Sequence, residues 1–265
     1  MPDLDIVLAE FTSDVERVEH LLTLIRGFKD FGGSVPPVVG EGEPPVWLEA
    51  AQLHQTASGR RTDLPVLSGS LQLYLAGRFE YCIRQIVEGV ADEICARVEK
   101  YADLPKSLQA ELRNRVLDVA KAPKKYGYDD LEAEALLESF VASRAITAPP
   151  VSIASQVLAL TDSNMRERVL SDVLLRVGIT EFWVNVGKQA PVKLFLEKST
   201  DSEATREAQS RLNNIMDERN QVAHPTGSTN FPDPDQVLKT AKFLTLIART
   251  CTDLAKIYLS SFASR

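Results

Sequence analysis

Residues 67–98 read LSGSLQLYLAGRFEYCIRQIVEGVADEICARV, the longest periodic segment of the chain. Apolar side chains recur in it every three or four positions, at Leu67, Leu71, Tyr74, Leu75, Phe79, Ile83, Ile86, Val87, Val90, Ile94 and Val98. This spacing places them along one face of an α-helix of about nine turns. We expect this helix to be the central packing element of the fold.

Helical patterns continue on both sides of this segment. Residues 4–31 carry apolar side chains at the same spacing and predict a helix that ends near Gly32. Residues 32–45 are rich in Gly and Pro, which predicts a linker, and a shorter helix is expected around residues 47–55. Residues 179–186 are interpreted as a short buried helix, because no partner strand is evident. Capping residues and prolines predict further helices over 105–121, 129–140, 162–175 and 203–223, and from 232 to the end.

The chain as a whole predicts an all-α fold, a helical bundle with additional peripheral helices. We expect residues 1–64, the first helix and the Gly/Pro-rich linker, to pack on a main helical domain formed by residues 65–265. The 265 residues are 44% hydrophobic and 25% charged, as in folded globular proteins with a sizeable core. No apolar run approaches 18 residues and the N-terminus lacks a basic, apolar leader, so we expect a cytoplasmic protein without a membrane span.

Cysteines and histidines restrict the chemistry. Cys82, Cys95 and Cys251 are odd in number and lie on apolar helical faces, where thiols are usually inert core residues. His20 and His54 lie among charged or polar residues, which is typical of solvated side chains. Metal-ligand spacings, Gly-rich phosphate loops and Ser-His-Asp arrangements do not appear, so we expect neither a metal nor a cofactor.

Residues 217–225 read DERNQVAHP and set a permanent cation five positions before a titratable group. Arg219 carries a planar fork of donors that fits phosphate oxygens, and histidine, here His224, is the residue type that titrates closest to neutral pH. Pro225 lacks an amide hydrogen and disfavours helix before it, so we expect the helix to end at or just before His224. A five-residue step on a helix turns through roughly 140°, so a helix break or a second subunit must bring the two side chains together.

The pattern Arg219-Asn220-x-x-x-His224 in a helical chain resembles the signature of the HEPN superfamily. An acidic residue directly after an aromatic one, Glu80, is similar to the RiboL-PSP branch, and the resemblance covers residues 65–260. It implies an all-α, often dimeric, metal-independent ribonuclease whose product carries a 2′,3′-cyclic phosphate. His224 would then transfer protons, Arg219 would stabilise charge on the non-bridging oxygens, and Asn220 would fix the backbone or orient His224.

The same residues also fit a structural interpretation. Arg219 can form a surface ion pair, and His224 can cap the carbonyls at a helix C-terminus. Glu80 either orients Arg219 or His224 as a supporting residue, or pairs with Arg84 four positions later on the same helix. Both interpretations of Glu80 stand.

Further candidate RNA contacts lie elsewhere in the chain. Lys124, Lys125 and Tyr126 place cations beside an aromatic ring, an arrangement suited to a single strand, and Thr226 and Ser228 offer hydroxyls just after the motif. The alternative for the first group is a solvated helix end whose tyrosines turn into the core. The net charge of −7 argues against non-specific coating of nucleic acid, but an enzyme with a confined site does not need many phosphate contacts.

The motif together with the HEPN resemblance predicts an endoribonuclease that cleaves single-stranded RNA as a homodimer, and the resemblance implies a role as a toxin or phage-defence effector. An antitoxin or a defence-system protein is then a candidate partner. One alternative is a non-catalytic HEPN-like module that recognises a nucleotide, RNA or a partner protein. The other is an all-α oligomerisation protein in which the motif arises by chance.

Overall fold

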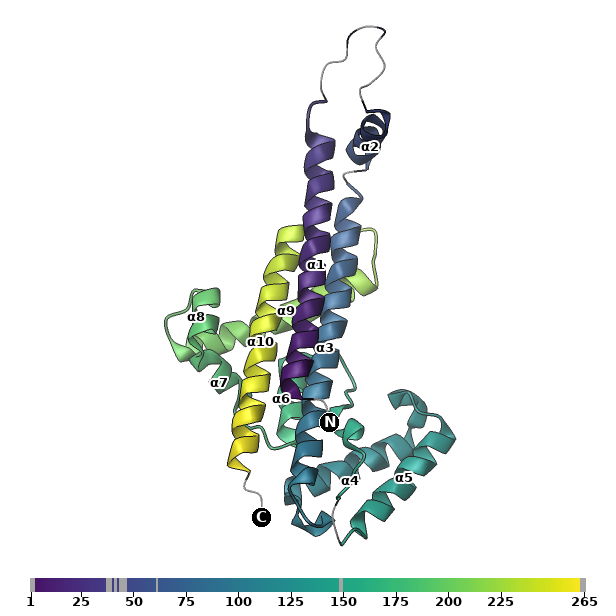
Figure 1. Cartoon of the computed structure of the whole chain (residues 1–265), viewed down its shortest axis with the longest axis vertical. Helices are drawn as coiled ribbons and strands as arrows, with labels where there is room; N and C mark the ends of the chain where they lie inside the picture. Colours follow the sequence, from purple (N-terminus) through teal and green to yellow (C-terminus); the bar gives the residue numbers. More distant parts are fainter. Residues whose placement is uncertain are drawn as a thin grey trace.

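The computed structural model describes residues 3–36, 40, 42, 47–60, 62–147 and 150–262. Every regular element within these ranges is helical and none is a strand (Figure 1). This confirms the predicted all-α fold. None of the described helices combines the length and the apolar character needed to cross a membrane.

Three long helices lie side by side at the centre: α1 (Leu4–Gly33), α3 (Leu64–Ala96) and α10 (Pro234–Ser261). Figure 1 shows α1 running antiparallel to the other two. The apolar face of α3 is fully buried between its neighbours, at Leu75, Phe79, Ile83, Ile86, Val90 and Ile94. The periodic segment is therefore the central packing element, as its sequence predicts.

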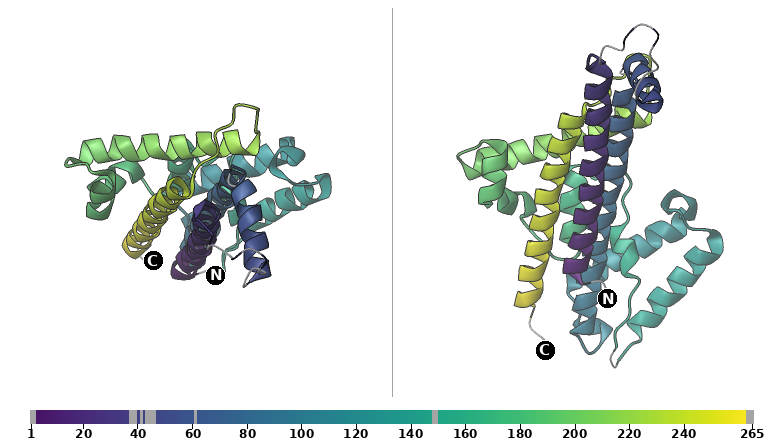
Figure 2. Two further views of the ribbon diagram at one scale, coloured as in Figure 1. Left: turned by 90° about the horizontal axis from the view of Figure 1, so that it is seen from above. Right: turned by 45° about the horizontal axis from the view of Figure 1, so that its top comes forward.

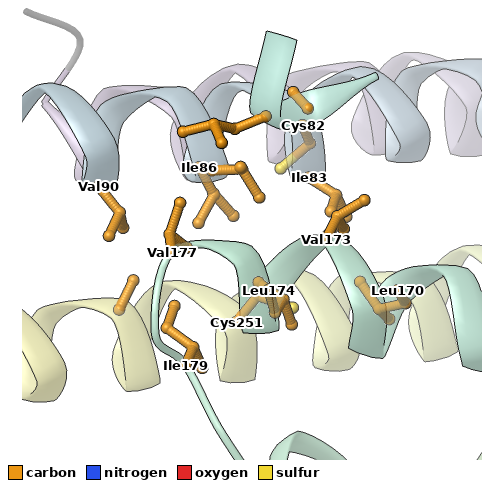
Figure 3. Packing of buried hydrophobic residues seen from close by; sticks show 14 of the residues in the cluster. Cys82, Ile83, Ile86, Val90, Leu170, Val173, Leu174, Val177, Ile179 and Cys251 are labelled. Atoms are coloured by element: carbon orange, nitrogen blue, oxygen red, sulfur yellow. The ribbon is translucent and has the colours of Figure 1, made fainter. Parts of the chain in front are cut away.

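Helix α6 (Glu167–Arg176) completes the core between α3 and α10. Figure 3 shows its side chains Leu170, Val173 and Leu174 packed beside Cys82 of α3 and Cys251 of α10. Burial raises the pKa of the Cys82 thiol to about 12 and the pKa of Cys251 well above its ordinary value. Both thiols stay protonated at neutral pH, which confirms that they are inert core residues.

The remaining helices surround this core. Helix α2 (Leu48–Gly59) packs on α1, while α4 (Lys106–Lys121) and α5 (Asp130–Arg144) form a helical hairpin beside the other end of α3 (Figure 1). Helices α7 (Phe182–Lys188) and α8 (Ala190–Leu196) lead into α9 (Asp201–Ala223), which lies across the long helices (Figure 2). Short 3₁₀ turns occupy Tyr101–Asp103, Pro123–Tyr126 and Ser155–Ala159.

The expected start of one helix is wrong, and one short helix has no counterpart in the sequence analysis. The helix expected from Asp162 begins only at Glu167, because residues 161–166 form a loop whose side chains bind other helices. The short helix α8 was not expected, since its seven residues are too few for a periodic pattern. In the expected linker of residues 32–45, residues 37–39, 41 and 43–45 lie outside the described residues. Division of the chain at residue 64 stays a prediction, although α1 shares its core with α3 and α10.

Two glycines allow helices to approach α9 closely. A β-carbon on Gly69 of α3 would lie 2.8 Å from the Phe231 ring and 3.0 Å from the Val222 side chain. A β-carbon on Gly187 of α7 would lie 2.1 Å from Oγ1 of Thr205 on α9. Only glycine fits at such distances. The C-terminal part of α9 is thereby seated on α3, and its first part on α7.

Candidate functional site at the end of α9

Helix α9 ends where the sequence predicts. Its last residue is Ala223, and His224 is the C-cap residue, whose backbone N–H donates to the carbonyl of Asn220 at 3.0 Å. Pro225 has no amide hydrogen with which to continue the ladder. The His224 side chain is exposed, and its imidazole makes no hydrogen bond or ion pair within the described part of the chain. A titratable group is thus presented to solvent at a helix exit.

The turn that follows is held by its own hydroxyl groups. The Thr226 N–H donates to Oγ1 of Thr229 at 2.7 Å, and the Thr229 N–H donates back to the Thr226 carbonyl at 3.0 Å. The hydroxyls of Thr226 and Ser228 are 3.1 Å apart and share a hydrogen bond. Both predicted contact residues are exposed on the turn that directly follows His224.

Arg219 is half-buried one turn before the helix end. Its Nη1 donates to Oδ1 of Asn220 at 3.2 Å, so a neutral amide holds the guanidinium. The two carboxylates that precede it are engaged elsewhere. Asp217 pairs with Arg166, which lies outside the helix, and Glu218 accepts from Nε2 of Gln72 at 2.9 Å. Since no ion pair to Arg219 occurs among the described residues, its positive charge is not neutralised by a protein carboxylate.

The loop of residues 161–166 supports this arrangement from the side. Nδ2 of Asn164 donates to Oδ1 of Asn220 at 2.6 Å, the same oxygen that accepts from the guanidinium. Two residues later, Arg166 pairs with Asp217, and its hydrogen bond lowers the pKa of that carboxyl. The 161–166 loop therefore contacts two residues of α9 close to Arg219, namely Asn220 and Asp217.

The loop is fixed at both of its ends. On one side the buried guanidinium of Arg176 donates to the carbonyls of Leu158 at 2.7 Å and Leu160 at 2.6 Å. On the other side the first amide of α6, at Glu167, donates to Oδ1 of Asn213 on α9 at 3.0 Å. The N-cap residue of α6 supplies no side-chain cap of its own, so Asn213 takes that part.

Two more predicted site residues meet the same loop. Oε1 of Glu80 accepts from Nη2 of Arg84 at 2.7 Å and from the Thr161 hydroxyl at 3.4 Å. Nζ of Lys125 lies 2.8 Å from the Asp162 carboxylate. No hydrogen bond joins Glu80 to the Arg219 or His224 side chain in the described ranges. Glu80 is therefore joined to Arg84 and to the loop, not to the motif residues.

The Lys124–Tyr126 segment lies in the 3₁₀ turn between α4 and α5. Lys124 and Lys125 are exposed, and Nζ of Lys125 lies 5.0 Å from the centroid of the Tyr126 ring. The Tyr126 ring also packs against the main core, as the structural interpretation of this segment expects, and a role in binding RNA stays a prediction.

Sequence reasoning missed the contribution of Asn164 and Arg166. The polar run Thr-Asp-Ser-Asn at 161–164 was interpreted as a helix start, although so many consecutive polar residues also suit a loop that reaches across to another element. In the part of the chain that the structure describes, no cluster of three or more His, Cys, Asp or Glu side chains could hold a metal ion.

Comparison with protein families matches residues 48–256 to the RiboL-PSP-HEPN family. The chain belongs to this family. The match confirms the suspected resemblance and spans α3, the 161–166 loop, α9 and most of α10, so the whole Arg219 arrangement lies inside the RiboL-PSP-HEPN region. No curated protein and no solved structure matches the chain. Membership of a HEPN family points to an RNase-type nuclease function.

Proposed function

We propose that the chain is a metal-independent endoribonuclease for single-stranded RNA, with Arg219 and His224 as its catalytic residues. The observation that carries this proposal is the way in which Arg219 is held. A neutral amide positions the guanidinium while neighbouring carboxylates bind other partners, so the charge remains available for a phosphate. Five residues later an exposed imidazole stands at the helix exit.

The chemistry follows from these two groups. The 2′-oxygen of a ribose attacks the adjacent phosphorus, a new P–O2′ bond forms and the P–O5′ bond breaks. The products are a 2′,3′-cyclic phosphate and a 5′-hydroxyl. His224 takes up the 2′-hydroxyl proton or delivers a proton to the 5′-oxygen. Nε and Nη2 of Arg219, which Asn220 does not occupy, donate to the non-bridging oxygens where negative charge increases.

We further propose that two copies of the chain act together, with their motifs facing one groove. Arg219 lies on α9 and His224 is the residue at which this helix ends, and no side-chain hydrogen bond joins them in the described residues. One imidazole does not readily take the 2′-hydroxyl proton and protonate the leaving oxygen in one step. A second copy supplies the other histidine.

Subunit mixing tests this dimer. Wild-type and His224→Ala chains are unfolded, mixed in equal amounts and refolded together. Mixed dimers then hold one histidine where the proposed reaction uses two, so cleavage should fall below about half of the wild-type rate, to about a quarter. A stable monomer with full activity, or a mixture that keeps about half of the wild-type rate, contradicts the shared groove.

RNA cleavage itself tests the function. Purified protein is incubated with single-stranded RNA in EDTA, and the ends of the products are identified by mass spectrometry. We expect 2′,3′-cyclic phosphate ends, no cleavage of DNA of the same sequence, and a loss of about 10²–10⁴-fold for His224→Ala. His20→Ala, an exposed histidine on α1, is the matched control and keeps full activity. Intact RNA that nevertheless binds the wild type favours the non-catalytic module instead.

The exposed side chains around the motif are proposed to bind the RNA strand. Thr226 and Ser228 lie beside His224, and Lys125 reaches the same loop that supports Arg219. Together with Lys124 and Tyr126 these residues would hold nucleotides on either side of the cleaved bond. Replacing Lys124 with Ser should lower the dependence of RNA affinity on salt concentration by about one ion, whatever the RNA sequence.

For the cellular role, we propose a toxin or a phage-defence effector, restrained by an antitoxin or acting with a defence-system protein. The support is the HEPN family membership. Induced expression of the wild-type chain should stop growth and deplete RNA, whereas His224→Ala should do neither. Unimpaired growth with the active wild type expressed at high level argues for a housekeeping role.

A further inference from the structure

We propose that Asn164 is a positioning residue for Arg219, an inference that rests on the proposed ribonuclease function. Asn164 is 56 positions away from Asn220 in sequence, yet its Nδ2 lies 2.6 Å from the Asn220 Oδ1. That oxygen is the one that accepts from Nη1 of Arg219 at 3.2 Å. A chain of two hydrogen bonds therefore runs from the 161–166 loop to the catalytic guanidinium.

The donors and acceptors of Arg219, Asn220 and Asn164 allow only one orientation of each asparagine side-chain amide. A guanidinium has donors and no acceptor, so the Asn220 atom that faces Arg219 must be its oxygen. Because that oxygen also faces Asn164, the latter must present its NH₂ group. Both lone-pair directions of Oδ1 are then used. The Asn220 amide is held against rotation, and its oxygen fixes one nitrogen of the guanidinium while the others stay free for a phosphate.

Asn164 can do this because its loop is fastened to α9 independently. The pair of Arg166 with Asp217 and the hydrogen bond from the Glu167 amide to Asn213 hold the loop in place without it. Removing the Asn164 side chain should therefore leave the loop attached while releasing the amide of Asn220. The half-buried Asn220 side chain then rotates between conformers, and Arg219 loses its fixed partner.

Three variants separate positioning from stability. Asn164→Ala removes the donor, and Asn164→Asp keeps the shape but places a carboxylate where a donor is needed. Asn213→Ala is the matched control, since it removes one loop-to-α9 hydrogen bond of similar length that does not lead to Arg219. In single-stranded RNA cleavage we expect kcat to fall about ten- to hundredfold for Asn164→Ala, and further for Asn164→Asp, with KM changed less than about threefold. Asn213→Ala keeps its kcat.

Coupling to Arg219 provides a readout that a merely structural role would not change. In an Arg219→Lys background the further change Asn164→Ala should cost almost nothing, because the group that Asn164 positions is already lost. A structural role predicts that the two losses multiply. Equal kcat values for wild type and Asn164→Ala, or fully multiplicative losses, overturn the proposal.

NMR of the Arg219 guanidinium decides the point without relying on catalysis. In the wild type and in Asn213→Ala we expect a restricted, resolved Nη signal, and in both Asn164 variants an averaged one. If the wild type does not cleave RNA, the proposed function fails, but this spectrum still tests the positioning by Asn164. An Arg219 signal that is unchanged in Asn164→Ala contradicts it.

Discussion

Two arginine clusters in this molecule use the same side chain in opposite ways. Where α1 meets α3, Asp14 is only 5% exposed and accepts from the Tyr74 hydroxyl at 2.6 Å, from Arg17 at 2.8 Å and from Arg78. At the end of α9, Arg219 is held by an amide and has no carboxylate partner among the described residues. The arginine neutralised by a buried acid fastens two helices, whereas the one held by a neutral group keeps a charge that no carboxylate of the described residues neutralises.

The protonation of Asp14 shows how strongly the first cluster is paired. Burial by itself would raise the pKa of this carboxyl, but the hydrogen bonds from Tyr74 and Arg78 and the charges of Arg78 and Arg17 outweigh burial. The net pKa lies below the ordinary value of 3.8. Asp14 is therefore ionised across the neutral range. The cluster around Arg219 has no such carboxylate among the described residues.

The largest expected effect comes from removing that charge. Asp14→Ala should lower the free energy of unfolding by roughly 3 kcal/mol, because it removes the acceptor of the half-buried Arg78 guanidinium and of the Tyr74 hydroxyl. Urea unfolding measures the loss, and RNA cleavage per folded molecule should be unchanged. Asp235→Ala is the control: it breaks a pair between α10 and α1 whose carboxylate is 75% exposed, and should cost under about 1 kcal/mol. Equal losses of unfolding free energy in Asp14→Ala and Asp235→Ala would contradict the claim that the buried ion pair stabilises the fold more than the exposed one.

A smaller effect is expected where α9 rests on α3. Gly69→Ala should lower the free energy of unfolding by about 1–3 kcal/mol, since the new methyl group meets the Phe231 ring and the Val222 side chain. It should also slow RNA cleavage, because the end of α9 with His224 shifts. Gly77→Ala on the same helix has open space around the new methyl group and serves as the control, with unchanged or slightly higher stability. Loss of stability in Gly77→Ala alone would contradict the packing argument.

Acid should narrow the difference between wild type and Asp14→Ala. The folded-state pKa of Asp14 is depressed, so its stabilising contribution is complete above the unfolded value of 3.8 and is lost as pH falls through the lower folded value. Thermal unfolding midpoints of the two proteins should differ by a constant amount from pH 7 to about pH 5 and converge below about pH 4. If the two midpoints differ by the same amount at pH 7 and at pH 3, Asp14 stabilises the fold through packing rather than through its charge.

The smallest effect is expected for the carboxylate beside the site. Asp217→Ala should change the free energy of unfolding by less than about 1 kcal/mol, because its pair with Arg166 is more than half exposed on the Asp217 side. Raising the salt concentration should reduce even this difference. A loss as large as that of Asp14→Ala would mean that the α9 cluster is structural after all.

The features of the fold and of the site that depend on local patterns can be predicted from the sequence. Apolar spacing predicts α3 as the central helix, and Pro225 predicts that α9 ends before His224, since both signals act within a few residues. The sequence does not predict the 161–166 loop, because the contacts that fix it are with residues far away in the chain. The hydrogen bond of Asn164 to Asn220 joins residues 56 positions apart, and nothing near Asp162 in sequence reveals it. Glu80 had two open interpretations, and only the fold shows its bonds to Arg84 and Thr161.

The central claim is that the partner of an arginine decides its role, and one paired measurement tests it most directly. Arg219→Lys and Arg78→Lys each keep the positive charge but lose the planar fork. We measure RNA cleavage in EDTA and the unfolding midpoint for both. Arg219→Lys should lose at least about tenfold in cleavage rate with an unchanged midpoint, and Arg78→Lys should show a lower midpoint with wild-type cleavage per folded molecule. Wild-type cleavage by Arg219→Lys would contradict the account.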